Sequence, residues 1–137
     1  MAGLNLSDDS MCFCCGQENE EGLKLEFHQE GDETVTRFSY PKRFQGYRDI
    51  VHGGLIATVL DEAMVTLLNE RGHLAVTGDL SVRFLRPLPV ETPVEIRARL
   101  VASRRNLFKL AATAVLEDGT EVARARSTFL STGSEAG

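Results

Sequence analysis

Apolar and polar residues alternate along most of this chain, a period-two pattern that is typical of β-strands with one buried face. In Pro93–Ala102, for example, apolar residues recur at every second position with charged residues between them. The same alternation, rich in β-branched and aromatic residues, predicts strands over Leu23–His28, Glu33–Tyr40, Val76–Pro87, Pro93–Ala102, Leu107–Glu117 and Glu121–Ser131. Turn-forming residues in the short links between several of them predict antiparallel hairpins.

A different pattern covers about Gly54 to Glu70, where apolar residues occupy most positions around a helical wheel. A helix that is apolar nearly all round is a buried helix. Gly72 follows as a residue type that commonly ends helices. The segment has one polar stripe, which consists of Thr58, Glu62, Thr66 and Asn69.

The order of two strands, one helix and four strands predicts the α+β class. Because the helix is apolar on both faces, the sheet must curve around it. This order resembles the hotdog fold, a curved antiparallel sheet of about six strands wrapped around one long central helix. The 137 residues fit a single domain, residues 1–137, and we expect an ordered core from about residue 11 to residue 131 between mobile polar tails.

The net charge is −5, and no segment carries a basic stripe. Nucleic acid is therefore not expected as a partner, since phosphate neutralisation needs clustered lysine and arginine. No apolar run approaches the roughly 20 residues of a membrane span. The N-terminus lacks a basic region followed by an apolar one, so we expect no secretory signal, no membrane partner and a cytoplasmic location.

The three cysteines all lie in Cys12–Cys15, and an odd number this close together is not a disulfide framework. Cys12 and Cys15 form a C-x-x-C pair, but a structural zinc site usually needs four ligands. The only later candidate nearby is His28, so we expect no metal site. A redox pair is not favoured, because no strand precedes the pair and no helix follows it. Packing at the start of a strand is the interpretation that remains.

Two adjacent acids, Asp61 and Glu62, lie in the predicted helix and point about 100° apart. Glu62 belongs to the polar stripe, which favours a structural role at solvent or at an interface. Asp61 lies at the edge of the apolar surface. A buried carboxylate is costly unless it is paired, protonated or functional, so a bond to backbone and a catalytic role are both open for Asp61.

His52, Gly53 and Gly54 come directly before the predicted helix. The first N–H groups of a helix have no internal partners and carry partial positive charge. Two glycines leave these groups open to a ligand, so the Gly54 N–H could stabilise an oxyanion. A plain turn into a helix is the alternative.

The spacing from Gly54 to Asp61 corresponds to about 10 Å of helix. An attacking group and an oxyanion donor must both lie roughly 3 Å from one reacting carbon. Within one chain they cannot meet, but across a two-fold axis with antiparallel helices they can. If both groups act on one carbonyl, the protein is therefore a dimer with shared sites.

The stretch from His52 to Met64, HGGLIATVLDEAM, resembles the signature of the hotdog thioesterase superfamily, in the branch of phenylacetate-pathway and 4-hydroxybenzoyl-coenzyme A thioesterases. The segments CFCCGQENEEGLKLEF, FQGYRDIVHGG and LSVRFLRPLPVE extend the resemblance over most of Cys12–Leu130. It implies an acyl-coenzyme A thioesterase that forms a dimer or a tetramer, with coenzyme A as part of the substrate and no separate cofactor.

The resemblance also implies roles for individual residues. Asp61 would be the general base or the nucleophile. The Gly54 N–H would hold the carbonyl oxygen, with Gly53 leaving room and His52 orienting the thioester. Thr77 would position water near the acid. Where many members carry an asparagine before the histidine this chain has Gly46, and Gln45 is the first substitute partner.

The phosphates of coenzyme A need exposed basic residues at the pocket mouth. The candidates are Arg83, Arg86, Arg104 and Arg105. Leu55, Val59 and Met64 are expected to line a tunnel for the acyl group. Two other classes stay open: a hydratase or dehydratase of the same fold, which would typically carry a His-Pro motif that is absent here, and a non-catalytic acyl-coenzyme A binder.

Overall fold

The computed structural model describes residues 6–134 of the chain. Its elements follow in the order β1 (His28–Glu30), β2 (Glu33–Ser39), the short 3₁₀ turn η1 (Lys42–Phe44), α1 (Gly53–Glu70), β3 (His73–Phe84), β4 (Pro93–Arg104), β5 (Leu107–Leu116) and β6 (Glu121–Ser134). Residues 1–5 and 135–137, which belong to the predicted tails, lie outside the described residues. Within them, no helix is long and apolar enough to cross a membrane.

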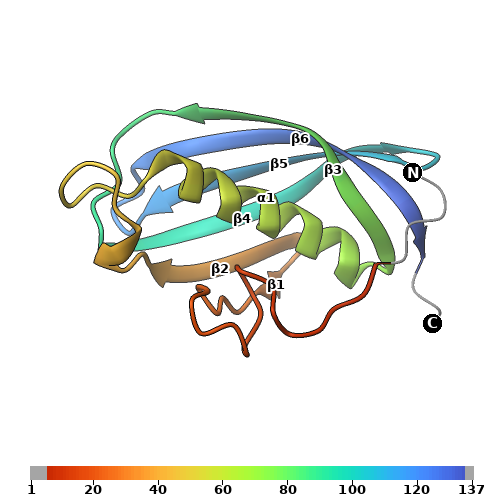
Figure 1. The fold of residues 1–137 in the computed structure, drawn as a ribbon. Coiled ribbons are helices and arrows are strands. Elements are labelled where there is room, and N and C mark those ends of the chain that lie inside the picture. The colour runs from red at the N-terminus through yellow and green to blue at the C-terminus, as the bar shows by residue number, and fades with distance from the viewer. Residues whose placement is uncertain (1–5, 135–137) are drawn as a thin grey trace.

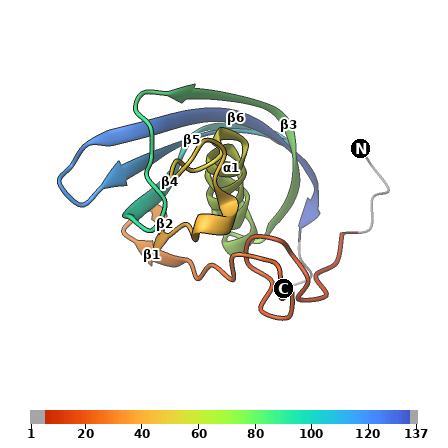
Figure 2. The same ribbon diagram turned by 60° about the vertical axis from the view of Figure 1, so that its left-hand side comes forward.

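The strands form one six-stranded antiparallel sheet in the order β1-β2-β4-β5-β6-β3. The sheet curls around α1, which runs along its concave face (Figures 1 and 2). This is the predicted hotdog fold, and it is confirmed. β1 and β3 are the two edge strands, and the long strand β3 leaves one row of backbone groups without a partner strand in this chain.

The hydrophobic core fills the space between α1 and the concave face of the sheet. Helical residues such as Leu60, Met64 and Leu67 are almost completely buried there against strand residues such as Ile96 and Phe129. Tyr40, the residue after β2, is also buried, and its hydroxyl donates to the Leu55 carbonyl at 2.9 Å. That bond fixes the first turn of α1 to the sheet.

The predicted strand Leu23–His28 is wrong over most of its length, because only His28 belongs to β1. The backbone N–H groups of Leu23 and Leu25 donate instead to the carbonyls of Phe13 and Cys14, at 2.9 Å and 2.8 Å. The apolar residues in this segment still face the core, which explains the alternation. The segment packs as a loop against another loop, so no strand begins near the cysteines.

Most other strand predictions are confirmed with shifted ends. β3 begins at His73 rather than Val76, and β6 continues to Ser134 rather than ending at Ser131. The two extensions depend on each other, since His73 pairs with Ser134 and Leu74 with Gly133. Each strand therefore supplies hydrogen-bond partners that lengthen the other.

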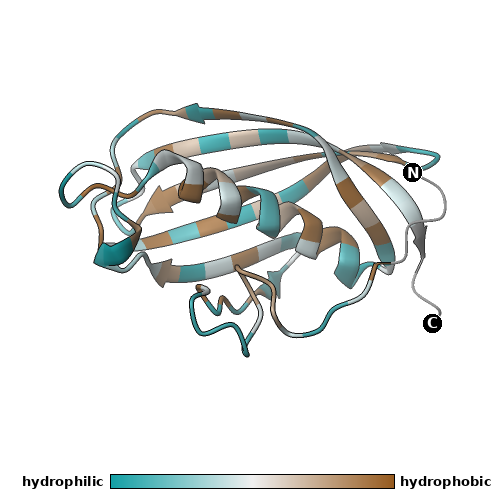
Figure 3. Cartoon of the chain, in the orientation of Figure 1, coloured by the Kyte–Doolittle hydropathy of each residue, from teal (hydrophilic) through white to brown (hydrophobic). Residues whose placement is uncertain are grey.

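The predicted helix is confirmed and begins one residue earlier, at Gly53, with His52 as its N-cap. It ends at Glu70, and Gly72 adopts a left-handed φ of 85°, as expected for the residue that leads out of a helix. Figure 3 shows a short hydrophilic band in the middle of α1 between more apolar turns. The two adjacent acids, Asp61 and Glu62, lie in the middle of α1.

Candidate active site

Asp61 lies halfway along α1 and is bonded to Thr77 of β3. The Thr77 hydroxyl donates to Asp61 Oδ1 at 2.8 Å. Asp61 is half-buried and Thr77 is exposed, so the carboxylate sits at the margin of the core and is accessible from outside. The structure thus brings together two residues that are far apart in sequence and that were both predicted for the site.

A β-bulge shapes β3 beside this bond. Thr77 pairs with Phe129 and Asp79 pairs with Thr128, so Gly78 is the extra residue between them. A Cβ at Gly78 would come within 3.1 Å of the Thr128 carbonyl, which favours glycine there. Bulges redirect neighbouring side chains and are frequent near active sites.

Burial raises the pKa of the Asp61 carboxyl above its ordinary value, and the hydrogen bond from Thr77 opposes part of that rise. Within residues 6–134, neither Asp61 nor Glu62 takes part in a salt bridge. An unpaired carboxylate with a raised pKa is a better proton acceptor than an ordinary surface aspartate.

The start of α1 differs from the predicted open oxyanion site. The Gly54 N–H donates to Nδ1 of His52 at 3.1 Å, so the imidazole caps the helix. Nδ1 is therefore the acceptor nitrogen of the ring in this arrangement. A ligand oxygen can reach the Gly54 N–H only if the His52 ring turns away.

The loop before the helix holds His52 in place. The His52 N–H donates to the Phe44 carbonyl at 3.0 Å, and a Cβ at Gly46 would lie 3.4 Å from His52 Cα. Gly46 thus allows the loop to pass close to the histidine. Gln45 is exposed and its side-chain oxygen accepts from the Asp49 N–H at 2.8 Å, so it stabilises its own turn.

Glu62 has partners that the sequence did not reveal. The thiols of Cys15 and Cys12 lie 3.2 Å and 3.6 Å from its Oε1 and donate to it. Cys14 is buried in the core. Burial and the bond to Glu62 raise the pKa of the Cys15 thiol, so Cys15 is protonated at neutral pH. The interpretation of the cysteines as the packing of a strand start is wrong, because they form a turn beside α1.

The four candidate arginines are exposed but do not form one cluster. Arg86 lies in the loop after β3. That loop reaches the start of α1 through Leu88, whose carbonyl accepts from the Val51 N–H at 2.8 Å. Arg104 and Arg105 occupy the β4–β5 turn, at the end of the sheet opposite the start of α1 (Figure 1). Arg83 faces Arg124 across the β3–β6 pair.

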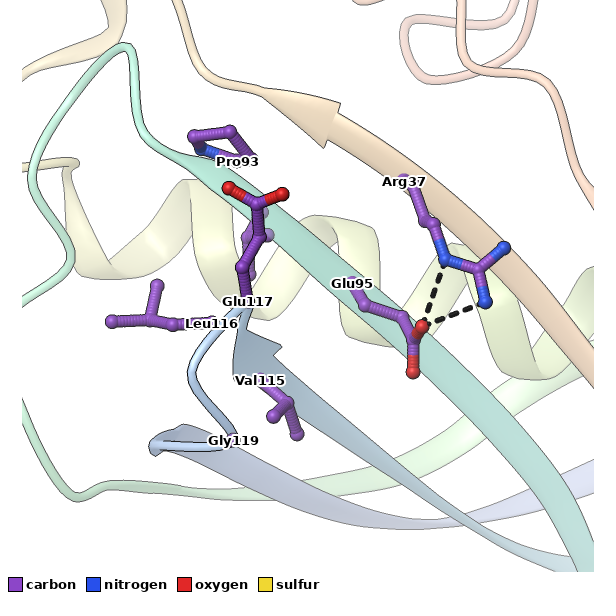
Figure 4. Close-up of a pocket in the computed structure, with 8 residues that line it drawn as sticks. Arg37, Pro93, Glu95, Val115, Leu116, Glu117 and Gly119 are labelled. Atoms are coloured by element: carbon purple, nitrogen blue, oxygen red, sulfur yellow. Dashed lines mark hydrogen bonds and ion pairs between the residues drawn. The ribbon is translucent and has the colours of Figure 1, made fainter.

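A pocket of about 460 Å³ opens between β2, β4 and the β5–β6 turn, and it contains neither Asp61 nor His52 (Figure 4). Arg37 and Glu95 meet at its wall through an ion pair of 2.8 Å. Of the residues predicted to line an acyl tunnel, Val59 and Met64 are completely buried in the core. Only Leu55 is partly accessible.

The fold and the site define a hotdog protein with an aspartate at the middle of its central helix and a His-Gly-Gly at the helix start. The model of the thioesterase superfamily matches residues 49–123, which include both features. The chain therefore belongs to the thioesterase superfamily.

Individual relatives agree with this assignment. The chain is 28% identical over 116 residues to acyl-coenzyme A thioesterase THEM4 of Mus musculus, a match that covers 81% of this chain and 50% of that protein. The chain thus spans about half the length of that curated relative.

Two solved structures share the fold. One is smu.793 of Streptococcus mutans bound to acetyl CoA, with a TM-score of 0.75 and 23% identity over 80% of this chain and 90% of that one. The other is PaaI of E. coli from the phenylacetic acid degradation operon, with a TM-score of 0.76 and 18% identity over 82% of each chain.

Proposed function

We propose that the protein is an acyl-coenzyme A thioesterase in which Asp61 is the general base or the nucleophile. The observation that carries this proposal is the half-buried carboxylate of Asp61, bonded to Thr77 at the bulge of β3. Its raised pKa favours proton transfer from water, and its accessibility allows attack on a carbonyl. The thioester class follows from the superfamily, and coenzyme A from the relatives that act on or bind it.

The helix start supplies the second half of the proposed site. A thioester oxygen would displace the His52 ring from the Gly54 N–H and accept that hydrogen bond itself. The freed imidazole would then lie beside the thioester and orient it. Gly53 adds no side chain of its own to this approach, although the Phe84 ring lies beside it. Gln45 keeps its role within the turn.

Each site would be shared by two chains. The start of α1 and Asp61 are separated by about 10 Å along one helix, too far to act on the same carbonyl. The unpaired edge of β3 is a surface on which a second copy could pair, and Leu80 and Phe84 are 38% and 52% exposed along it. A symmetric dimer would set the start of one helix against Asp61 of the other.

Among the basic candidates, Arg86 is the one best placed for the coenzyme A phosphates, because its loop adjoins the start of α1. The acyl chain would enter beside Leu55, since Val59 and Met64 have no accessible surface.

The test is release of free thiol from a panel of aryl, short, medium and long acyl-coenzyme A esters. We expect Asp61→Asn to bind the ester but to lose about 10²- to 10⁴-fold in kcat. Asp118→Asn, in the β5–β6 turn, is the matched control and should keep the parental rate. Turnover by Asp61→Asn at the parental rate would contradict the proposal. Tight ester binding without thiol release by the unmodified chain would identify a binder, and hydration of an enoyl ester would identify a hydratase.

A further inference from the structure

A cluster of potential metal ligands includes Glu62, the residue that follows Asp61 on α1. The thiols of Cys12 and Cys15 and the carboxylate of Glu62 have ligand atoms that all lie within 4.8 Å of one another. The three side chains are half-buried. They come from the N-terminal loop and from α1, 47 residues apart for the closest pair.

The loop that carries the thiols is built as a tight turn. The Gly16 N–H donates to the Cys12 carbonyl at 2.8 Å, which puts Cys12 and Cys15 on the same side. A Cβ at Gly16 would lie 2.4 Å from the Cys12 nitrogen, so only glycine fits this turn without a backbone shift. Cys14, which is 3% exposed, anchors the same turn in the core.

The donor types select a class of ion. Two sulfur ligands favour Zn²⁺ and other thiophilic ions over Mg²⁺ and Ca²⁺, which prefer oxygen alone. The Glu62 carboxylate is free to bind an ion, because among the described residues the only hydrogen bonds of its side chain are with the two thiols. Three protein ligands leave the fourth position of a tetrahedral ion to water.

We propose that Cys12, Cys15 and Glu62 form a zinc-binding site that fastens the N-terminal loop to the central helix. Binding replaces the two S–H donors by thiolates, releases their protons to solvent and leaves the oxidation state of sulfur unchanged. The ion would join the loop to the residue that follows Asp61 on α1. This site is separate from the proposed thioesterase chemistry, because it uses neither Asp61 nor the helix start.

The test uses the full chain, reduced and freed of metal with a chelator, and titrated with Co²⁺ and then with Zn²⁺. We expect one Co²⁺ per chain, with the thiolate-to-cobalt charge-transfer absorption and the visible bands of a tetrahedral site, and displacement by Zn²⁺. Cys15→Ser and Glu62→Gln should each weaken binding by at least about tenfold, because each removes one of three protein ligands. Zn²⁺ should raise the Tm of the unmodified chain more than that of Glu62→Gln.

Cys14→Ala is the matched cysteine control and should bind Co²⁺ as the unmodified chain does. Because Cys14 is buried, that variant could fail to fold, and Glu18→Gln in the same loop is then the second control. Circular dichroism of each metal-free variant separates loss of a ligand from loss of the fold. A folded, reduced chain that takes up no Co²⁺ overturns the proposal. So does Co²⁺ binding by Cys15→Ser or by Glu62→Gln that is as tight as that of the unmodified chain. A Cys12–Cys15 disulfide that forms in excess Zn²⁺ overturns it as well. None of these measurements depends on thioester hydrolysis, so the two proposals stand or fall separately.

Discussion

The two adjacent acids on α1 show how one residue step along a helix changes the chemistry of a side chain. Asp61 points toward β3 and bonds to Thr77, whereas Glu62 points toward the N-terminal loop and accepts from two thiols. The angle of about 100° between successive helical residues separates the two environments. One acid can therefore serve catalysis while its neighbour serves the loop.

The hydrogen bond from Thr77 should tune the pH profile of the enzyme. In the proposed mechanism the reactive form of Asp61 is the carboxylate, so kcat should rise as the pH rises through the pKa of Asp61. Because the Thr77 bond lowers that pKa, Thr77→Val should move the acidic limb of the profile to higher pH. Thr77→Ser keeps the hydroxyl and should restore the profile, which a merely structural effect of the substitution would not do.

Asp61 should also affect stability in a pH-dependent way. The pKa of Asp61 is raised in the folded chain, so the unfolded chain ionises at a lower pH than the folded chain does. The folded state therefore loses stability as the pH rises, until the pH passes the pKa of the folded chain. Asp61→Asn lacks this loss. We expect the unfolding free energy of Asp61→Asn, measured in urea, to increase relative to that of the unmodified chain as the pH rises above about 4, the usual pKa of an unfolded aspartate.

Asp118→Asn provides the opposite case. The bonds from Thr120 lower the pKa of Asp118, so its contribution to stability is present above the unfolded pKa and is lost as the pH falls. This variant should become relatively less stable as the pH rises. The same trend in both variants would contradict the assignment of burial as the cause at Asp61.

At the scale of elements, loops rather than strands build most of the candidate sites. The turn at the cysteines, the loop around Gly46 and the loop after β3 each pack against α1 or its start. Their backbone bonds close turns or join one loop to another and do not follow strand ladders, so period-two alternation carries no signal for them. The false strand at Leu23–His28 has the same cause.

Gly16→Ala tests the packing of the cysteine turn. The added Cβ would lie 2.4 Å from the Cys12 nitrogen and 2.5 Å from the Ser10 carbonyl oxygen, so the backbone must shift. We expect a loss of about 1–3 kcal/mol in the free energy of unfolding, measured in urea. Gly31→Ala is the comparison, because its Cβ meets nothing within 4 Å and only its left-handed φ of 62° opposes alanine. An equal or smaller effect at Gly16 would argue against the close packing.

At the scale of the whole molecule, the proposed sharing of sites can be tested by mixing inactive chains. Dimers purified with one Asp61→Asn chain and one His52→Ala chain would have one intact site out of two. We therefore expect about half of the unmodified activity from mixed dimers and little from either parent variant. If the mixed dimers are as inactive as both parent variants, each chain carries its own site. If the active protein is a monomer in solution scattering, the sites are not shared.

The linear sequence determined the class of the fold, the central helix and the residues on which the proposed chemistry rests. Those features depend on local periodicity and on residue types close to each other, as in the His-Gly-Gly start of α1. The tertiary structure alone decided which distant groups meet. It joined Asp61 to Thr77, placed the His52 ring on the Gly54 N–H, and brought Glu62 to Cys12 and Cys15. Such contacts depend on how the chain folds back on itself, and no periodicity along the chain records that distance in space.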